Sequence, residues 1–166
     1  MPIALVGAKG IGKSDIFKQV AKEEYLQYID LRLAENVDSG DLIGIPYNDK
    51  GIMRWSTPEW WPTPDEPALI VLEEPNRASR DIRQAVFQLL NEKKIHTHSL
   101  SENHFIGLAF NPPGDEYQVD DLDPAMIRRM CVIPVETNIK TFLEYATGKL
   151  DKNIIEYLQI NQNLLS

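Results

Sequence analysis

The sequence predicts an α/β fold in which short apolar strands form a parallel sheet and alternate with helices. Two observations support this prediction. A glycine-rich segment, residues 7–14, stands between the apolar run Pro2–Val6 and a helix-like stretch that begins near Asp15. The run Ala68–Leu72 is apolar throughout, which is typical of a strand covered on both faces in a parallel sheet.

The glycine-rich segment matches the pattern G-x-x-x-x-G-K-S/T in the strand–loop–helix context that phosphate binding requires. Its glycines permit backbone turns in which N–H groups converge on phosphates, and the following helix adds positive charge at its N-terminus. Lys13 is expected between the β- and γ-phosphates, and the Ser14 hydroxyl is expected to bind Mg²⁺. The alternative is a turn without a ligand. The predicted nucleotide contacts are Gly7, Ala8, Lys9, Gly10, Ile11, Gly12, Lys13, Ser14 and Asp15.

Composition limits the possible classes. The chain has 166 residues, 43% of them hydrophobic, enough for one ordinary core but not for a second full domain. A formal net charge of -8 gives no overall basic surface for nucleic acid, although a local basic patch stays open.

The single cysteine, Cys131, excludes an internal disulfide and suits a reducing compartment; it is predicted to be a small core residue on a strand. No apolar run approaches the ~20 residues that cross a bilayer, and no signal peptide precedes the glycine-rich segment. The sequence thus predicts a cytoplasmic protein, in a bacterium or in the host of a virus, without a membrane partner.

The spacing of apolar residues predicts the helices and strands before residue 68. Helical spacing places one apolar face on the first helix, and alternation predicts a second strand at Tyr28–Leu33. Glycines and prolines then interrupt residues 36–67, which leaves a short helix near Asp38–Ile43 and a hairpin near Asn48–Gly51. The apolar face of the first helix comprises Ile16, Phe17, Val20, Ala21 and Tyr25. The three tryptophans of the interrupted region either seal the edge of the core or belong to a contact loop: Trp55, Trp60 and Trp61.

The third strand ends in two acidic residues, Glu73 and Glu74. Carboxyl ends of parallel strands lie at the edge where an α/β sheet builds its ligand site, so both carboxylates are expected beside the glycine-rich segment. One would hold Mg²⁺, directly or through water, and the other could polarise an attacking water. A solvated strand end is the alternative interpretation.

Beyond this strand, Ser79 is a predicted N-cap for a helix that continues to about Lys94, with an apolar stripe of Ile82, Val86, Leu89 and Leu90. A fourth strand, His104–Phe110, ends at Asn111, whose amide could orient water against a γ-phosphate. The turn Pro112–Gly114 and an exposed acidic stretch, 115–123, are expected to follow.

A short helix at Leu122–Arg129 and a fifth strand at Cys131–Val135 complete the predicted sheet region. Arg128 and Arg129 are read either as a solvated helix end or as guanidinium groups offered to a phosphate. The three histidines, His96, His98 and His104, are too few and too loosely spaced to predict a metal site.

The order of these segments resembles that of the AAA+ ATPases, and within them the MoxR-like branch, over residues 2–136. The stretches that carry the resemblance are the P-loop followed by DLIG, LIVLEEPNRA, LLNEKKI, GLAFNPPGD and LDPAMIRRM. The resemblance implies a P-loop NTPase three-layer sandwich with a five-stranded parallel sheet. It assigns residues 1–136 to the large ATPase subdomain and 137–166 to a partial helical lid, with helices at Thr141–Leu150 and Asn153–Leu158.

The resemblance also implies roles. Lys13 and Ser14 correspond to Walker A, Glu73 to the metal-binding acid of Walker B, and Glu74 to the catalytic glutamate. Asn111 matches the sensor 1 residue, Arg129 best matches the arginine finger, and Arg128 is second. Residues 41–62 resemble an inserted region that faces the pore or partner proteins in related rings. The implied ligands are ATP and Mg²⁺, and the implied partners are further copies in a ring, a hexamer, and a protein substrate or adaptor.

Three departures from the family pattern matter. Glu73 replaces the usual Asp, so metal contact is expected to become water-mediated. The segment that usually precedes the first strand and helps hold adenine is missing, and the lid is short, so no sensor 2 arginine is assigned. We therefore expect a truncated or unusually minimal member, with a hint of viral or mobile-element origin.

The sequence leaves three functions open. The first is an ATPase that hydrolyses MgATP at subunit interfaces and remodels a partner protein, in the manner of a chaperone. The second is a nucleotide-gated binding module with little turnover. The third is a DNA-handling AAA+ ATPase, against which the acidic charge counts.

Overall fold

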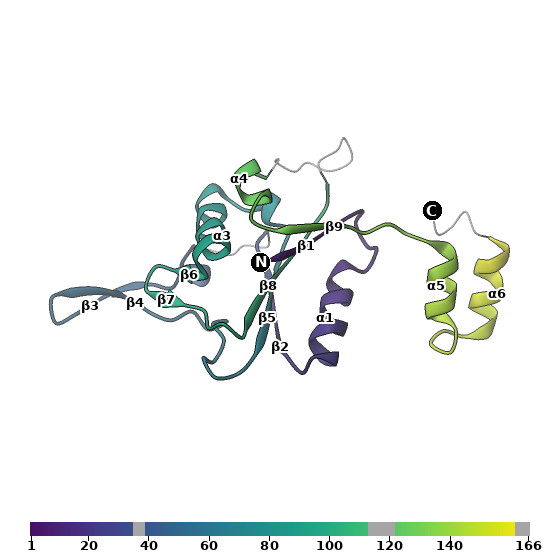
Figure 1. Ribbon diagram of the computed structural model, residues 1–166, viewed down its shortest axis with the longest axis horizontal. Coiled ribbons are helices and arrows are strands. Elements are labelled where there is room, and N and C mark those ends of the chain that lie inside the picture. The colour runs from purple at the N-terminus through teal and green to yellow at the C-terminus, as the bar shows by residue number, and fades with distance from the viewer. Residues whose placement is uncertain (35–38, 113–121, 162–166) are drawn as a thin grey trace. The chain divides into compact units, whose positions relative to one another are not determined.

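The computed structural model describes residues 1–34, 39–112 and 122–161 of the chain (Figure 1). It divides into two compact units, Met1–Pro134 and Val135–Ser166. The division falls two residues before the boundary expected from the sequence. The candidate site lies in the first unit.

Five parallel strands form the sheet of the first unit, in the order β2-β5-β8-β1-β9 among the described residues (Figure 1). This confirms the predicted five-stranded parallel sheet. Strand β8 lies between β1 and β5, so the residue that follows β8 is held between the P-loop and the acidic end of β5. The bounds are β1 Ile3–Val6, β2 Gln27–Arg32, β5 Ala68–Glu73, β8 His104–Phe110 and β9 Cys131–Pro134.

One face of the sheet packs with helix α3, Arg80–Glu92, in the main hydrophobic core. The Ser79 side chain accepts a hydrogen bond from the Ile82 N–H, which confirms the predicted N-cap, and the predicted apolar stripe is buried. The helix ends before Lys94 because Lys93 adopts a left-handed conformation, with φ 51°. A small hairpin that the sequence did not predict follows, formed by β6 (Lys94–Ile95) and β7 (His98–Ser99).

The opposite face carries helix α1, Lys13–Glu23. Its Phe17 ring lies so close to Gly107 of β8 that a Cβ atom there would come within 2.7 Å of the ring, so this position requires glycine. Only part of the predicted apolar face is buried. Phe17 and Ala21, one turn apart, face the sheet, whereas Ile16 and Val20 are exposed at the side of the helix. The prediction was wrong for Tyr25, which lies beyond the helix end and is 90% exposed.

The interrupted region contains helix α2, Ser39–Ile43, and the antiparallel strands β3, Pro46–Asp49, and β4, Ile52–Trp55. Lys50 and Gly51 form the turn of this hairpin with positive φ angles of 53° and 86°, as a two-residue hairpin turn requires. The predicted hairpin is therefore present. Figure 1 shows it extending away from the sheet of its own unit.

The three tryptophans do not share one environment. Trp60 and Trp61 pack against the core, and the Trp60 Nε1–H donates a hydrogen bond to the Leu42 carbonyl at 3.1 Å. They seal the core edge. Trp55 lies at the base of the β3–β4 hairpin, where its ring stacks on His96 with a centroid distance of 4.1 Å.

The end of the first unit comprises helix α4, Pro124–Ile127, and strand β9. Cys131 is on the predicted strand, but the prediction that it is a core residue was wrong. Strand β9 is an edge strand that pairs with β1 alone in the described sheet, so Cys131 is exposed. The predicted turn residues 113–114 and most of the acidic stretch, 115–121, lie outside the described residues.

The second unit contains two helices, α5 (Ile139–Ala146) and α6 (Lys152–Ile160). The side chains of Asn138 and Asp151 cap their N-termini. Ala146 is buried between them, while several larger apolar side chains remain exposed: Phe142, Tyr145, Ile154, Tyr157 and Ile160. In the described part of the chain, no helix combines the length and apolar character needed to cross a membrane.

Candidate nucleotide-binding site

A cavity of about 220 Å³ lies at the carboxyl ends of β1, β5 and β8, where ligands bind in open α/β sheets. Most of the predicted P-loop residues, both acidic residues and Asn111 line it. Three predicted contacts, Gly7, Ala8 and Ile11, do not line the cavity. Ala109 and Phe110 line it although the sequence did not predict them. The full lining is Lys9, Gly10, Gly12, Lys13, Ser14, Asp15, Glu73, Glu74, Ala109, Phe110 and Asn111.

The loop between β1 and α1 depends on its glycines for backbone conformation. Gly10 and Gly12 have φ angles of 80° and 91°, and a Cβ atom at either position would meet nothing within 4 Å. The left-handed conformation, not a lack of space, therefore favours glycine at these positions. Gly12 precedes α1 and supplies no side-chain cap, so the first N–H groups of the helix are available to an anion.

Lys13 is the buried cation of the site, with 8% of the residue exposed. Its Nζ donates hydrogen bonds to the carbonyls of Gly7 at 2.9 Å and Ala8 at 2.7 Å, and to the Asn111 Oδ1 at 2.9 Å. Burial lowers the pKa of Lys13 below its usual value, and the carboxylates of Glu74 and Glu73 partly oppose this effect. An anion in the cavity would further favour the charged amine.

Asn111 is buried with 3% exposure, and its Oδ1 accepts a hydrogen bond from Lys13. A lysine ammonium can only donate hydrogen bonds, so the Asn111 Oδ1 must face the Lys13 Nζ. The Nδ2 of the Asn111 amide therefore faces another direction. The Nδ2 is buried and has no hydrogen-bond partner among the described residues. Asn111 therefore holds an unused donor in a residue that lines the cavity, as a water- or phosphate-orienting amide should.

Asn76 does not line the cavity, but it contacts a residue that does, and the sequence interpretation did not include it. It lies in a short 3₁₀ turn, η1 (Pro75–Arg77), directly after the two acidic residues, and it is also 3% exposed. Its Nδ2 donates a hydrogen bond to the Asn111 carbonyl at 3.1 Å. A polar residue two positions after the acidic pair was the available signal, but its burial could not be predicted from a single sequence.

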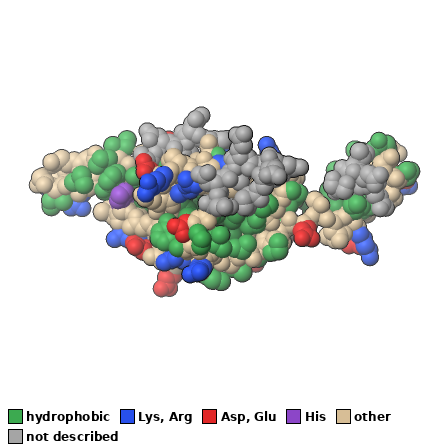
Figure 2. All heavy atoms as spheres, turned by 90° about the horizontal axis from the view of Figure 1, so that it is seen from above, with side chains coloured by type: hydrophobic (Ala, Val, Ile, Leu, Met, Phe, Trp, Pro, Cys, Tyr) green, Lys and Arg blue, Asp and Glu red, His purple; other side chains and the backbone are tan. Residues whose placement is uncertain are grey.

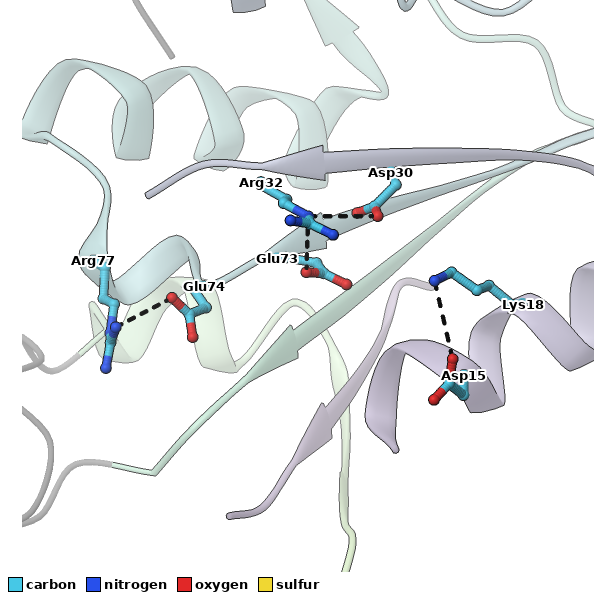
Figure 3. Close-up of polar contacts among 7 residues, drawn as sticks. All are labelled: Asp15, Lys18, Asp30, Arg32, Glu73, Glu74 and Arg77. Carbon is cyan, nitrogen blue, oxygen red and sulfur yellow. Dashed lines mark ion pairs between the residues drawn. The ribbon is translucent and has the colours of Figure 1, made fainter. Parts of the chain in front are cut away.

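Glu73 ends β5 beside Arg32, its register partner at the end of β2. The Arg32 Nε lies 3.9 Å from the Glu73 Oε2 and 3.8 Å from the Asp30 Oδ2, and Figure 3 shows the guanidinium between the two carboxylates. The contact is long and the arginine is largely exposed, so it contributes little to stability. It does show that the longer Glu73 side chain reaches a cation of the neighbouring strand.

Glu74 has an unusual backbone conformation, with φ 52° and ψ 47°. A non-glycine residue in this left-handed region costs about 1–3 kcal/mol and is often found at functional sites. Its N–H donates to the Ala109 carbonyl at 2.8 Å, and its Oε2 lies 3.4 Å from the Arg77 Nη1 (Figure 3). The turn thus directs the second carboxylate away from the strand direction of the first.

These residues fit a triphosphate and Mg²⁺. Ser14, Glu73 and Glu74 supply hard oxygen donors to one cavity. Among the described residues, no group of three or more His, Cys, Asp and Glu side chains could hold a metal by itself. Mg²⁺ typically binds to one or two protein oxygens together with phosphates and water, which this set allows. The cavity is smaller than the ~300 Å³ of a typical ligand site, so it suits the phosphate end of a nucleotide.

The two candidate arginines differ in their contacts. The Arg129 Nε donates to the Asn91 Oδ1 at 2.8 Å and its Nη1 to the Ala125 carbonyl at 2.7 Å, while its guanidinium lies over the Phe87 ring. Arg128 is exposed. Neither arginine lines the cavity of its own chain.

A family model described as AAA domain (dynein-related subfamily) matches residues 2–130. The chain belongs to this AAA family. The predicted AAA+ relationship is therefore confirmed, at the level of the dynein-related, MoxR-like branch. No curated protein sequence matches the chain.

Solved structures support the AAA fold. A predicted ATPase from Cytophaga hutchinsonii ATCC 33406 has a TM-score of 0.60 and 18% identity, and the match covers 88% of this chain and 45% of that one. A single-residue variant of RuvB from Thermotoga maritima has a TM-score of 0.57 and 13% identity, covering 87% of this chain and 42% of that one. This AAA chain thus spans less than half the length of either structure.

Proposed function

We propose that this AAA chain binds MgATP, hydrolyses it at an interface between copies, and uses the cycle to remodel a partner protein. The observation that carries the proposal is the shared cavity of Lys13, Asn111 and Glu74. These three residues come from three different strand ends, and the sheet order brings them together. Each supplies a function that phosphoryl transfer needs: a cation, an orienting amide and an acceptor for a proton.

The roles follow from the contacts. Lys13 exchanges backbone carbonyls for phosphate oxygens, which are stronger partners for a buried ammonium. The free Asn111 Nδ2 donates to the attacking water or to the γ-phosphate, and the Glu74 carboxylate accepts the proton of that water. Ser14 and Glu73 would hold Mg²⁺, which would supply positive charge against the phosphates.

No arginine is among the described residues that line the cavity. Neither Arg128 nor Arg129 lines the cavity, so either would have to reach the nucleotide of a neighbouring copy. The exposed Arg128 is available without rearrangement, whereas Arg129 would have to release Asn91 and Ala125. An arginine supplied in this way contributes ~10³-fold or more, so hydrolysis should depend on assembly, for which we propose a hexameric ring.

The exposed apolar side chains of the β3–β4 hairpin support the proposal of a protein partner. It is formed by local residues and exposes Ile52 by 60% and Met53 by 67%, with Ile45 and Tyr47 also exposed. Figure 2 shows hydrophobic side chains at the end of the unit that this hairpin occupies in Figure 1. Apolar side chains gathered on an extended ribbon suit contact with another protein surface, a substrate or an adaptor.

The test is ATP hydrolysis as a function of protein concentration, with molecular mass from light scattering on the same samples. We expect a specific rate that rises as oligomers form. In Glu74→Gln, binding of a fluorescent ATP analogue should persist while turnover falls by ~10²-fold or more, because the proton acceptor is lost. Hydrolysis at the wild-type rate in this variant would remove Glu74 from the mechanism.

A nucleotide-gated binding module is the second candidate, favoured by Arg32, whose guanidinium lies 3.9 Å from Glu73 and would compete weakly with a metal ion for that carboxylate. This module predicts tight nucleotide binding with negligible turnover at every concentration. The same experiment therefore separates the two functions.

A further inference from the structure

We propose that Asn76 is a positioning residue for hydrolysis, acting through Asn111. The inference rests on the proposed ATPase function, because it assigns Asn111 the task of orienting water or phosphate. Asn76 does not line the cavity, so it is not expected to touch the nucleotide. Its effect would pass through the hydrogen bond to the Asn111 carbonyl at 3.1 Å.

Asn76 is one of the few polar side chains that are buried in the described part of the chain. The described residues contain four buried polar or charged side chains, and three of them form one connected chain: Lys13, Asn111 and Asn76. A carbonyl can only accept, so the Asn76 Nδ2 must face Asn111, which leaves its Oδ1 buried without a partner among the described residues. A half-satisfied amide stabilises a core poorly compared with an apolar side chain of the same size. Asn76 therefore calls for an explanation other than stability.

The position of Asn76 in the fold also connects it to Asn111. Asn76 stands in the turn η1, whose preceding residue is the strained Glu74. Two hydrogen bonds fasten this turn to the end of β8: the Glu74 N–H to the Ala109 carbonyl and the Asn76 Nδ2 to the Asn111 carbonyl. Only the second reaches the residue that carries the orienting amide. Loss of this bond would free the Asn111 backbone, which follows the last strand residue, while Lys13 still holds its Oδ1.

The experiment compares Asn76→Leu with wild type at a concentration where oligomers form. We expect turnover to fall by ~10- to 100-fold, because small displacements of a catalytic group have effects of this size. Affinity for a fluorescent ATP analogue should stay within about threefold, and the melting temperature within ~3 °C. Asn103→Leu is the matched control, since it removes another amide with an unpartnered buried Oδ1, at the opposite end of β8.

A merely structural role for Asn76 predicts a lowered melting temperature with a proportionate loss of binding, and that result would overturn the proposal. Unchanged turnover would do so as well. If Asn76→Leu does not fold, Asn76→Ala is measured in the same way, with the same expectations for turnover and affinity.

A double-mutant cycle tests the route through Asn111. Asn111→Ala keeps the backbone carbonyl but removes the orienting amide, so Asn76→Leu should lower turnover little further in that background. An equal fold-loss in both backgrounds would show that Asn76 does not act through Asn111. Failure of the proposed function is distinguishable, because wild type would then show no turnover that Glu74→Gln removes.

Discussion

The candidate nucleotide site and the β3–β4 hairpin differ in the sequence separation of their residues and in the kind of side chain that they bury. The site gathers residues from distant parts of the sequence and buries their polar groups, so that Lys13 and Asn111 contact each other across 98 positions. The hairpin is formed by ten consecutive residues, 46–55, and exposes apolar side chains instead. The first arrangement is already shaped for a small anion, whereas the second presents groups that water solvates poorly.

The contrast suggests how the two regions divide the work. A site of buried, mutually hydrogen-bonded groups is costly to rearrange, so it suits chemistry that requires fixed geometry. A hairpin that contributes little to the core can change its contacts without affecting the fold. One contact that links it to the rest of the unit is the stacking of Trp55 on His96.

The largest expected effect tests whether the buried site is complete within one chain. We expect Arg128→Ala to lower the assembly-dependent hydrolysis rate by ~10³-fold and to leave nucleotide binding by isolated subunits unchanged. The physical reason is the loss of a cation that a neighbouring copy would place at the transferred phosphate. The measurement is hydrolysis against concentration beside equilibrium binding in dilute solution.

Arg129→Ala is the matched comparison. Arg129 contacts Asn91, Ala125 and Phe87 within its own chain, so its removal should lower the stability of the nucleotide-free protein by about 1–2 kcal/mol. A loss of assembly-dependent hydrolysis in Arg129→Ala with unchanged stability would instead identify Arg129 as the arginine that acts on the neighbour. Weaker binding by the monomer in either variant would place that arginine in its own site.

A smaller effect is expected at the buried cation. Lys13→Ala removes charge-assisted hydrogen bonds to phosphate, each worth about 1.5–3 kcal/mol, so affinity for ATP should fall ~10- to 100-fold. Calorimetric titration with ATP measures the change. Burial disfavours the charged amine of Lys13 and lowers its pKa. The melting temperature of the nucleotide-free Lys13→Ala variant should therefore lie within a few degrees of the wild-type value. A large drop in melting temperature would make Lys13 a structural residue.

The same contrast explains what the sequence could predict. Local patterns located the P-loop, the acidic end of β5, the Ser79 cap and the β3–β4 hairpin, because each depends on residues close together in the chain. Cys131 was misplaced because burial at a sheet edge depends on what lies beside the strand. Asn76 was missed because its partner is 35 residues away and no local pattern marks that contact.

The first helix is a further case in which a local pattern did not determine burial. Periodicity groups apolar residues on one side, but the width of the face that is buried depends on the surface beneath it. Gly107 admits the Phe17 ring and leaves Ile16 and Val20 at the side. The sheet, not the helix, decided which of these side chains became part of the core.

The smallest expected effect is at the hairpin, where substitutions at its exposed strand residues should affect stability less than a substitution at its base. The double variant Ile52→Ser with Met53→Ser removes exposed apolar groups, so stability should change by no more than about 0.5 kcal/mol and ATP affinity should not change. Trp55→Ala should lower stability by ~1 kcal/mol or more, because it removes the ring that stacks on His96. Denaturant unfolding beside ATP titration measures both. If the double variant proved as destabilising as Trp55→Ala, Ile52 and Met53 would stabilise the fold. That result would contradict the interpretation of the hairpin as a surface for partner binding.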